Sequence, residues 1–214
     1  MDKTIIDDAL EFVRNIFNDD YSGHDYFHTL RVYKMATRIA EQENANLIIV
    51  QLAALLHDVD DIKLSPETYA NKDRAVGFLR KHDISETMIK NICNIIGEVS
   101  FNGTDSITPE TIEGKCVQDA DRLDAMGAIG IARAFAYGGS HNRAIYDPEI
   151  EPTVNMNADK YQSHLSTTIN HFYEKLFQLK DLMNTDTAKK ISEQRDDYMK
   201  TYISEFLDEW DGIR

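Results

Sequence analysis

A nearly continuous apolar run is the strongest feature of the hydropathy pattern. It covers residues 47–56, in which only Gln51 is polar, and it is followed at once by His57 and Asp58. A run of this length is typical of a fully buried helix and is too short to span a membrane. Such a helix either delivers metal ligands or a catalytic pair from the core, or simply enters solvent through polar residues. The run alone allows both interpretations.

Apolar residues recur at helical spacing along most of the remaining chain. This spacing predicts helices over about residues 2–18, 25–43, 128–136, 159–183 and 185–209. Residues typical of helix caps predict further helix starts at Ser65, Ser85 and Thr108. No strand pattern or internal repeat is visible, so we predict an all-α fold, a single helical bundle with two long C-terminal helices.

The longest polar and irregular stretch covers residues 137–158 and contains Gly138, Gly139 and His141. At roughly twenty residues it exceeds the usual length of a connection between helices. This length favours a lid or a binding loop, with disorder as the alternative.

Composition and charge limit the classes of partner. The chain has 214 residues, a length that suits one domain, and its formal net charge of -14 disfavours binding to nucleic acid or to an anionic membrane. Cys93 and Cys116 lie in apolar helical contexts, and the first residues carry no signal-peptide pattern. We therefore expect reduced cysteines and a cytoplasmic protein.

Side chains that commonly bind metals occur at three separate places: His28, the pair His57 and Asp58, and the aspartates at 119, 121 and 124. Adjacent residues on a helix point about 100° apart. His57 and Asp58 can therefore share one ion only near a helix end, which is where the apolar run puts them. Two imidazoles with two carboxylates suit one divalent transition metal (Mn, Fe, Co, Ni or Zn) better than Mg²⁺, which prefers oxygen ligands. A six-coordinate ion would keep positions open for water and a substrate oxygen.

These residues resemble the H…HD…D signature of the HD-domain phosphohydrolase superfamily. The flanking residues 23–28 and 52–58 fit the same signature, and residues 120–123 are similar to the Ala-Asp-Arg-Leu segment of guanosine-tetraphosphate hydrolases. The resemblance implies one HD domain over residues 1–214, with a signature core of about 23–126 and a C-terminal helical part of about 159–210. It implies four metal ligands and favours Asp121 over Asp119 and Asp124 as the last of them; the set is His28, His57, Asp58 and Asp121.

The resemblance also implies groups that handle water and phosphate. Some relatives have a catalytic glutamate three residues after the HD pair, where this chain has the shorter Asp61. We expect Asp61 to orient or deprotonate the attacking water, or else to be a solvated loop carboxylate. Because the protein is acidic, phosphate binding needs local cations, for which the candidates are His24, Arg31, Arg133 and Lys175. His82 is expected to be a solvated surface residue.

Residues 127–135 and 171–176 are similar to a bacterial HD subgroup that includes nucleoside-triphosphate pyrophosphohydrolases. This similarity implies that a metal-activated water hydrolyses (deoxy)nucleoside triphosphates to monophosphate and pyrophosphate, with a nucleotide as the small-molecule partner. The alternatives are a nucleoside 5′-monophosphate phosphatase and a non-catalytic nucleotide-binding or regulatory module. His82 is the only histidine between the HD pair and Asp121, which favours one metal and disfavours two-metal phosphodiesterases and HD-type oxygenases. No oligomeric state is predicted.

Overall fold

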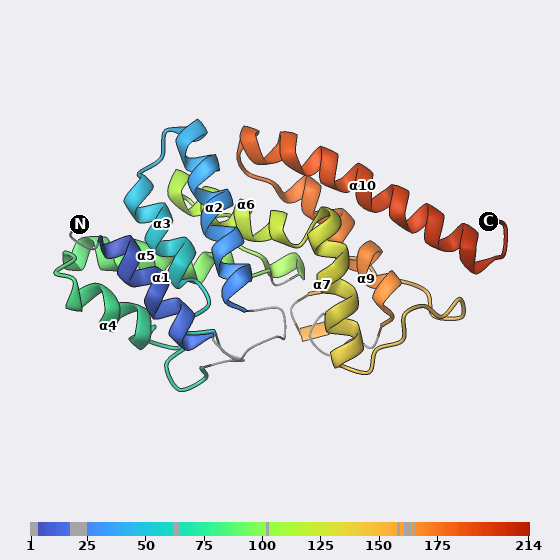
Figure 1. The fold of residues 1–214 in the computed structure, drawn as a ribbon, viewed down its shortest axis with the longest axis horizontal. Coiled ribbons are helices and arrows are strands. Elements are labelled where there is room, and N and C mark those ends of the chain that lie inside the picture. The colour runs from blue at the N-terminus through green and yellow to red at the C-terminus, as the bar shows by residue number, and fades with distance from the viewer. Residues whose placement is uncertain are drawn as a thin grey trace. The chain divides into compact units, whose positions relative to one another are not determined.

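The computed structural model describes residues 4–17, 25–61, 65–101, 103–157, 159–160, 164 and 166–214. Within these ranges every regular element is a helix, which confirms the predicted all-α class (Figure 1). The chain forms two compact units, one made of Met1–Ser100 and Ile107–Asp121, the other of Phe101–Ser106 and Arg122–Arg214. That residues 1–214 act as a single domain stays a prediction.

The first unit is built around α3 (Leu47–Leu56), the apolar run of the sequence. From Val50 to Leu56 every residue except Gln51 is buried. The helix packs against α1 (Ile5–Ile16), α2 (Tyr26–Glu43) and α5 (Glu86–Val99), while α4 (Asp73–Lys81) packs on α5. Each large apolar side chain buried here contributes about 1.5–3 kcal/mol, so α3 is held firmly and its last residue has a fixed position in the core.

Several helix starts are set by side-chain caps that the sequence carries. Thr4 forms a capping box with Asp7 before α1, and Asn46 and Ser85 cap α3 and α5. The helices predicted at the beginning of the chain, over the apolar run and after Ser85 are therefore confirmed to within about three residues, the usual uncertainty of helix ends.

Two predicted helix starts are wrong. Residues 66–72 form turns after Ser65, and α4 begins only at Asp73, because the preceding Lys72 has φ 54°, a left-handed conformation that does not continue a right-handed helix. The helix expected from Thr108 is α6 (Ile112–Asp124). It begins later because the Thr111 hydroxyl accepts the Gly114 N–H, at 3.0 Å, as a cap would.

The second unit contains α7 (Gly127–Ser140), α9 (Thr168–Glu174), the 3₁₀ helix η2 (Leu176–Leu182) and α10 (Asp186–Trp210). Helix α10 packs against α7 and η2 and confirms the predicted last helix, and Thr185 caps it. The single helix predicted over residues 159–183 is wrong. Thr167 has an extended backbone and caps α9, and Lys175, with φ -140°, separates α9 from η2.

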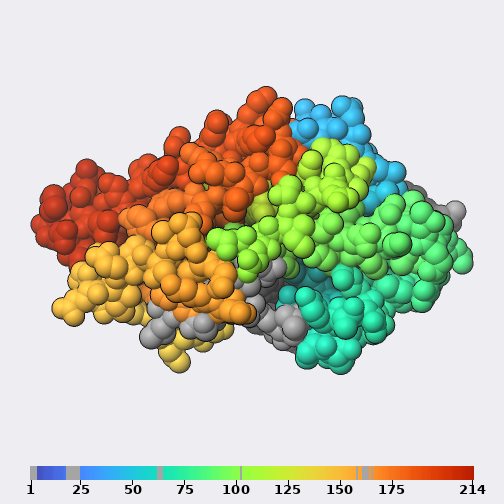
Figure 2. Space-filling view, turned by 180° about the vertical axis from the view of Figure 1, so that it is seen from behind, coloured from blue at the N-terminus to red at the C-terminus, as the bar shows by residue number. Residues whose placement is uncertain are grey.

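The irregular segment 141–157 packs on the helices of its own unit. Ala144 and Ile145 accept the backbone N–H groups of Thr168 and Ile169, each at 2.9 Å. The Tyr146 ring meets the rings of Phe206 and Trp210 edge to face, and Figure 2 shows this gold segment against the red C-terminal end of α10. A lid function for residues 137–158 stays a prediction.

Among the described residues, no helix combines the length and the apolar character needed to cross a membrane. Both cysteines are free, as predicted; Cys116 is buried and Cys93 is partly exposed. Burial raises the pKa of the Cys116 thiol to about 12. This thiol is therefore protonated at neutral pH and serves as an apolar core residue.

Candidate metal centre

The first turn of α2 positions His28. Asp25 caps this helix and accepts the backbone N–H of His28 at 2.6 Å. His28 is the third residue of α2, and its side chain is only 1% exposed. The cap therefore fixes the place at which α2 begins and directs the His28 imidazole into the core of the first unit.

The end of α3 positions His57 and Asp58. The helix ends at Leu56, His57 is its C-cap, and the next residues form a turn. The side chains of the two neighbours converge there, with 3.2 Å between His57 Nε2 and Asp58 Oδ2. His57 Nδ1 donates a hydrogen bond to the Ala54 carbonyl at 2.9 Å. This bond selects the tautomer in which Nε2 keeps its lone pair for a metal.

Three buried groups meet at one point. His28 Nε2 lies 3.3 Å from His57 Nε2 and 3.4 Å from Asp58 Oδ2. The ligand atoms of these three residues all lie within 4.8 Å of one another. Asp121 of α6 approaches from the His28 side, with its Oδ1 3.4 Å from His28 Nε2. The Asp121 side chain is 26% exposed, so it marks the side of the group that is open to solvent.

The donor set and its spacing fit a divalent ion. Atoms that share one ion at about 2.1 Å lie about 3.0–3.4 Å apart, which is the spacing found among these groups. Two imidazole nitrogens and two carboxylates also match the ligands that divalent transition metals take in proteins. The group of His28, His57 and Asp58 could therefore hold a metal ion.

The electrostatics of the group favour positive charge. Burial lowers the pKa of His57. The neighbouring carboxylates of Asp58 and Asp121, together with the bond to Ala54, raise this pKa by more than burial lowers it, so that it lies at about 9. The same carboxylates that hold a proton on His57 would attract a metal cation in its place.

Asp119 and Asp124, the other candidates for the fourth ligand, lie elsewhere on α6. Asp119 is fully buried. Asp124, one helical turn after Asp121, forms an ion pair with Arg133 at 2.7 Å. The structure thus brings Asp121 beside His28.

The remaining predicted site residues are placed less directly. Asp61 is partly exposed in the turn after Asp58, whose carbonyl accepts its N–H at 3.1 Å. Arg31 lies nearly one turn beyond His28 on α2 and is partly exposed. Arg133 and Lys175 belong to the second unit, where Lys175 lies over the Phe101 ring at 4.8 Å. His24 lies outside the described residues.

Asp60 is a buried structural residue in the turn that follows the HD pair. It is 3% exposed, and its two carboxylate oxygens accept the backbone N–H groups of Arg74 and Ala75 at 3.1 and 2.9 Å. Asp60 therefore caps α4 from a distance and anchors the turn that carries Asp58. A cap formed across fourteen residues of sequence has no local pattern that would have revealed it.

Known proteins resemble the chain over most of its length. The HD domain family model matches residues 25–126. An HD-superfamily hydrolase from Bacillus thuringiensis is 44% identical, with 96% of each chain covered and a TM-score of 0.76. A solved structure from Lactobacillus plantarum is 38% identical over 99% of both chains, with a TM-score of 0.87. YpgQ of Bacillus subtilis, in complex with ADP, is 36% identical over 96% of this chain and 100% of its own, with a TM-score of 0.75.

The chain belongs to the HD-domain superfamily of hydrolases. The region matched by the HD domain model includes all four residues His28, His57, Asp58 and Asp121. The superfamily resemblance stated from the sequence is thereby confirmed, and so is the expectation that the protein is an enzyme of this superfamily. The narrower resemblance to nucleoside-triphosphate pyrophosphohydrolases stays a prediction.

Proposed function

We propose that this HD-domain protein is a metal-dependent phosphohydrolase that acts on a nucleotide and cuts (deoxy)nucleoside triphosphates to monophosphate and pyrophosphate. The observation that carries the proposal is the buried group of His28, His57 and Asp58, with the more exposed Asp121 at its open side. A nucleotide ligand is supported by the YpgQ relative, whose structure is a complex with ADP.

We assign the metal site to His28, His57, Asp58 and Asp121. Its proposed occupant is one divalent transition metal, with Mn²⁺ as the first candidate and Ni, Co, Fe or Zn as the others. Such an ion supplies Lewis acidity, which lowers the pKa of a bound water toward about 7 and polarises a phosphoryl oxygen. The chain's own contribution is to orient the His57 imidazole so that its Nε2 is turned toward the site of the ion. The hydrogen bond from His57 to the Ala54 carbonyl serves this purpose on α3.

Asp61 is the proposed group that handles the attacking water. It follows the HD pair within the same turn and is partly exposed, so its carboxylate can reach solvent. A carboxylate in this position accepts a proton from water or fixes the direction in which the water attacks. Phosphoryl transfer also needs cations for the developing charge, and the proposed phosphate-binding residues are His24, Arg31, Arg133 and Lys175.

Product analysis tests the proposal. The purified protein is loaded with Mn²⁺ and incubated with each deoxynucleoside triphosphate and monophosphate, and phosphate and pyrophosphate are measured separately. The proposal predicts equal amounts of monophosphate and pyrophosphate from triphosphates. Orthophosphate released from monophosphates would instead identify a nucleotide phosphatase, and tight nucleotide binding without turnover would identify a binding module.

A further inference from the structure

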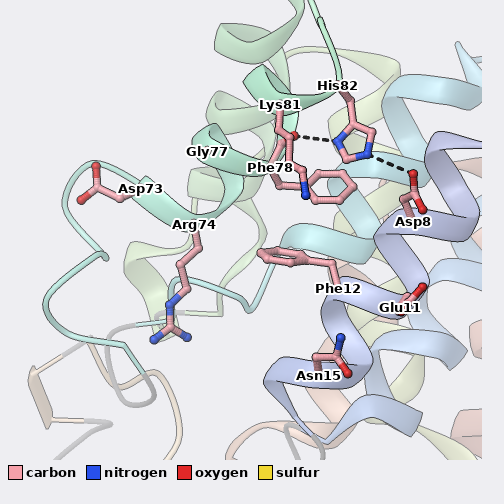
Figure 3. A pocket seen from close by; sticks show the side chains of 10 residues that line it. All are labelled: Asp8, Glu11, Phe12, Asn15, Asp73, Arg74, Gly77, Phe78, Lys81 and His82. Atoms are coloured by element: carbon pink, nitrogen blue, oxygen red, sulfur yellow. Dashed lines mark hydrogen bonds and ion pairs between the residues drawn. The ribbon is translucent and has the colours of Figure 1, made fainter.

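A cavity of about 610 Å³ opens between α1 and α4 in the first unit (Figure 3). Its volume lies within the range of about 300–1,000 Å³ that is usual for small-molecule sites. None of its lining residues belongs to the metal cluster.

The floor of the cavity is aromatic. Phe12 of α1 and Phe78 of α4 stack with 4.9 Å between ring centroids and 28° between their planes. The His82 ring lies 4.3 Å from the Phe78 ring, and His82 Nε2 lies 3.1 Å from an Asp8 carboxylate oxygen. The expectation that His82 is a solvated surface residue is therefore wrong. This residue joins the end of α4 to α1 and holds the two sides of the cavity together.

The α4 side of the cavity carries cations on either side of a gap. Arg74, Gly77 and Lys81 recur at helical spacing and line the cavity together. A Cβ atom added at Gly77 would meet no atom within 4 Å, so the missing side chain leaves open space in this wall. Glycine inside a helix is unfavourable by about 0.5–1 kcal/mol relative to alanine, and here it widens the cavity.

The α1 side offers acceptors and an amide. Glu11 and Asn15, one helical turn apart on α1, line the cavity, and Figure 3 shows them on the side opposite Arg74. A carboxylate on such a wall accepts hydrogen bonds from ribose hydroxyls. The cavity therefore combines a flat apolar surface, hydroxyl acceptors and two cations, of which Arg74 also pairs with Glu67 at 3.3 Å and neighbours Asp73 in the lining.

We propose that this cavity is a second binding site and that its ligand is a nucleoside monophosphate. The base lies against Phe12, Arg74 and Lys81 bind the phosphate, and Glu11 and Asn15 bind the ribose. Aromatic rings stack on bases irrespective of sequence, and guanidinium and ammonium groups are common phosphate ligands. Neither inorganic phosphate nor a nucleoside alone would contact the aromatic ring, the cations and the ribose-binding groups together.

Hydrogen bonds join the cavity to the turn that carries His57 and Asp58. Arg74, which lines the cavity, is the second residue of α4, and its backbone N–H donates to Asp60, two residues after Asp58. Its guanidinium also donates to the Val59 carbonyl at 3.5 Å. A ligand that orders this first turn of α4 also orders the turn that carries His57 and Asp58, so occupancy of the cavity strengthens metal binding. This coupling rests on the proposed metal centre, whereas ligand binding does not.

Calorimetric titration of the EDTA-treated protein with AMP, adenosine and inorganic phosphate tests the binding. We expect AMP to bind at one site, with adenosine and phosphate each at least about tenfold weaker. Gly77→Leu, which fills the gap, weakens AMP binding at least about tenfold, and the control Gly77→Ala changes it less than about twofold. Lys81→Gln weakens AMP binding about tenfold and leaves adenosine binding unchanged. All of these changes follow from filling the cavity or removing one phosphate ligand.

Three results would overturn the proposed site: AMP that does not bind, AMP that binds equally well to Gly77→Leu, or phosphate alone that binds as tightly as AMP. Both substituents at position 77 have a higher helix propensity than glycine, so a loss in Gly77→Leu cannot be assigned to failure of α4 to form. Circular dichroism of the variants provides the direct check.

Titration with Mn²⁺ tests the coupling separately. Saturating AMP should tighten Mn²⁺ binding about fivefold in the wild-type protein and leave it unchanged in Gly77→Leu, since coupling between two sites typically amounts to about 5–150-fold. An equal tightening of Mn²⁺ binding by AMP in both proteins would place the AMP at the metal centre and contradict the coupling. Protein that binds AMP but no Mn²⁺ would overturn the proposed function and retain the second site.

Discussion

The carboxylate of Asp60 accepts the backbone N–H of Ala75 at 2.9 Å, and this bond ties the turn after the HD pair to the first turn of α4. The neighbouring N–H, that of Arg74, binds the other carboxylate oxygen at 3.1 Å. The N-cap of α4, Lys72, makes no side-chain cap hydrogen bond. Asp60 therefore supplies the cap that α4 lacks, and α4 in turn holds the metal-binding turn in place.

Replacing Asp60 should lower both stability and metal affinity. Asp60→Ala removes two charge-assisted hydrogen bonds in a buried place, which costs about 3–5 kcal/mol of unfolding free energy. Because the turn loses its anchor, Mn²⁺ affinity should fall about 10–100-fold, the usual effect of removing a supporting group. Urea unfolding and calorimetric titration measure the two effects. A stability loss below about 1 kcal/mol would contradict the capping role.

The cap of α2 is expected to act on the metal centre as well. Asp25→Ala removes the bond to the His28 N–H and should lower the free energy of unfolding by about 1 kcal/mol. It should also weaken Mn²⁺ binding, because His28 lies in the turn that the cap fixes. Thr4→Ala is the matched control, since it removes the cap of α1 instead. We expect both variants to lose comparable stability and only Asp25→Ala to change its Mn²⁺ affinity. Equal Mn²⁺ affinities in the two variants would show that the cap has no part in positioning the ligand.

Asp61 is expected to affect turnover without affecting metal content. Asp61→Ala should keep the Mn²⁺ content of the wild-type protein and lower kcat by about 10²–10⁴-fold, the usual contribution of a general base. Asp61→Glu restores a carboxylate and should recover part of the rate. Metal analysis and steady-state kinetics on the same preparations measure both quantities. An unchanged kcat in Asp61→Ala would remove this residue from the mechanism.

Acid sensitivity should arise in part from His171 in the second unit. Burial, and then the charges of Lys175 and Arg143, lower the pKa of His171 from 6.5 to about 3. Between about pH 3 and pH 6.5 this histidine is therefore protonated in the unfolded chain and neutral in the folded chain. The contribution of His171 to the free energy of unfolding is complete above about pH 6.5 and is lost as the pH falls toward 3. His171→Gln should flatten this loss in urea unfolding measured from pH 7 to pH 4. An equally steep loss in the variant would exclude His171 as its source.

The sequence predicted the elements whose signals are local. The apolar run of α3, the polar pair at its end and the cap Ser85 each depend on residues a few positions apart, and all of them are found in the structure. Helix geometry allowed His57 and Asp58 to converge, since neighbours can share an ion only where the helix ends, and the superfamily resemblance implied that they do.

Tertiary interactions decided the features that the sequence analysis missed. Asp60 caps α4 across fourteen residues, and His82 pairs with Asp8 across 74, so neither role has a local pattern. The break at Lys175 lies within an apolar periodicity that continues on both sides, which is why residues 159–183 resembled one helix. A backbone conformation chosen by packing overrides the periodicity at such a position.

The metal content of Asp58→Ala tests the central claim most directly. Wild-type protein and variant are loaded with Mn²⁺, freed of excess metal by gel filtration and analysed by inductively coupled plasma mass spectrometry, with the exposed Asp181→Ala as control. The account predicts about one ion per chain in the wild-type and control proteins and, because a ligand of a four-residue site is lost, less than about one tenth of an ion in Asp58→Ala. A full complement of Mn²⁺ in folded Asp58→Ala would contradict the assignment of the metal centre.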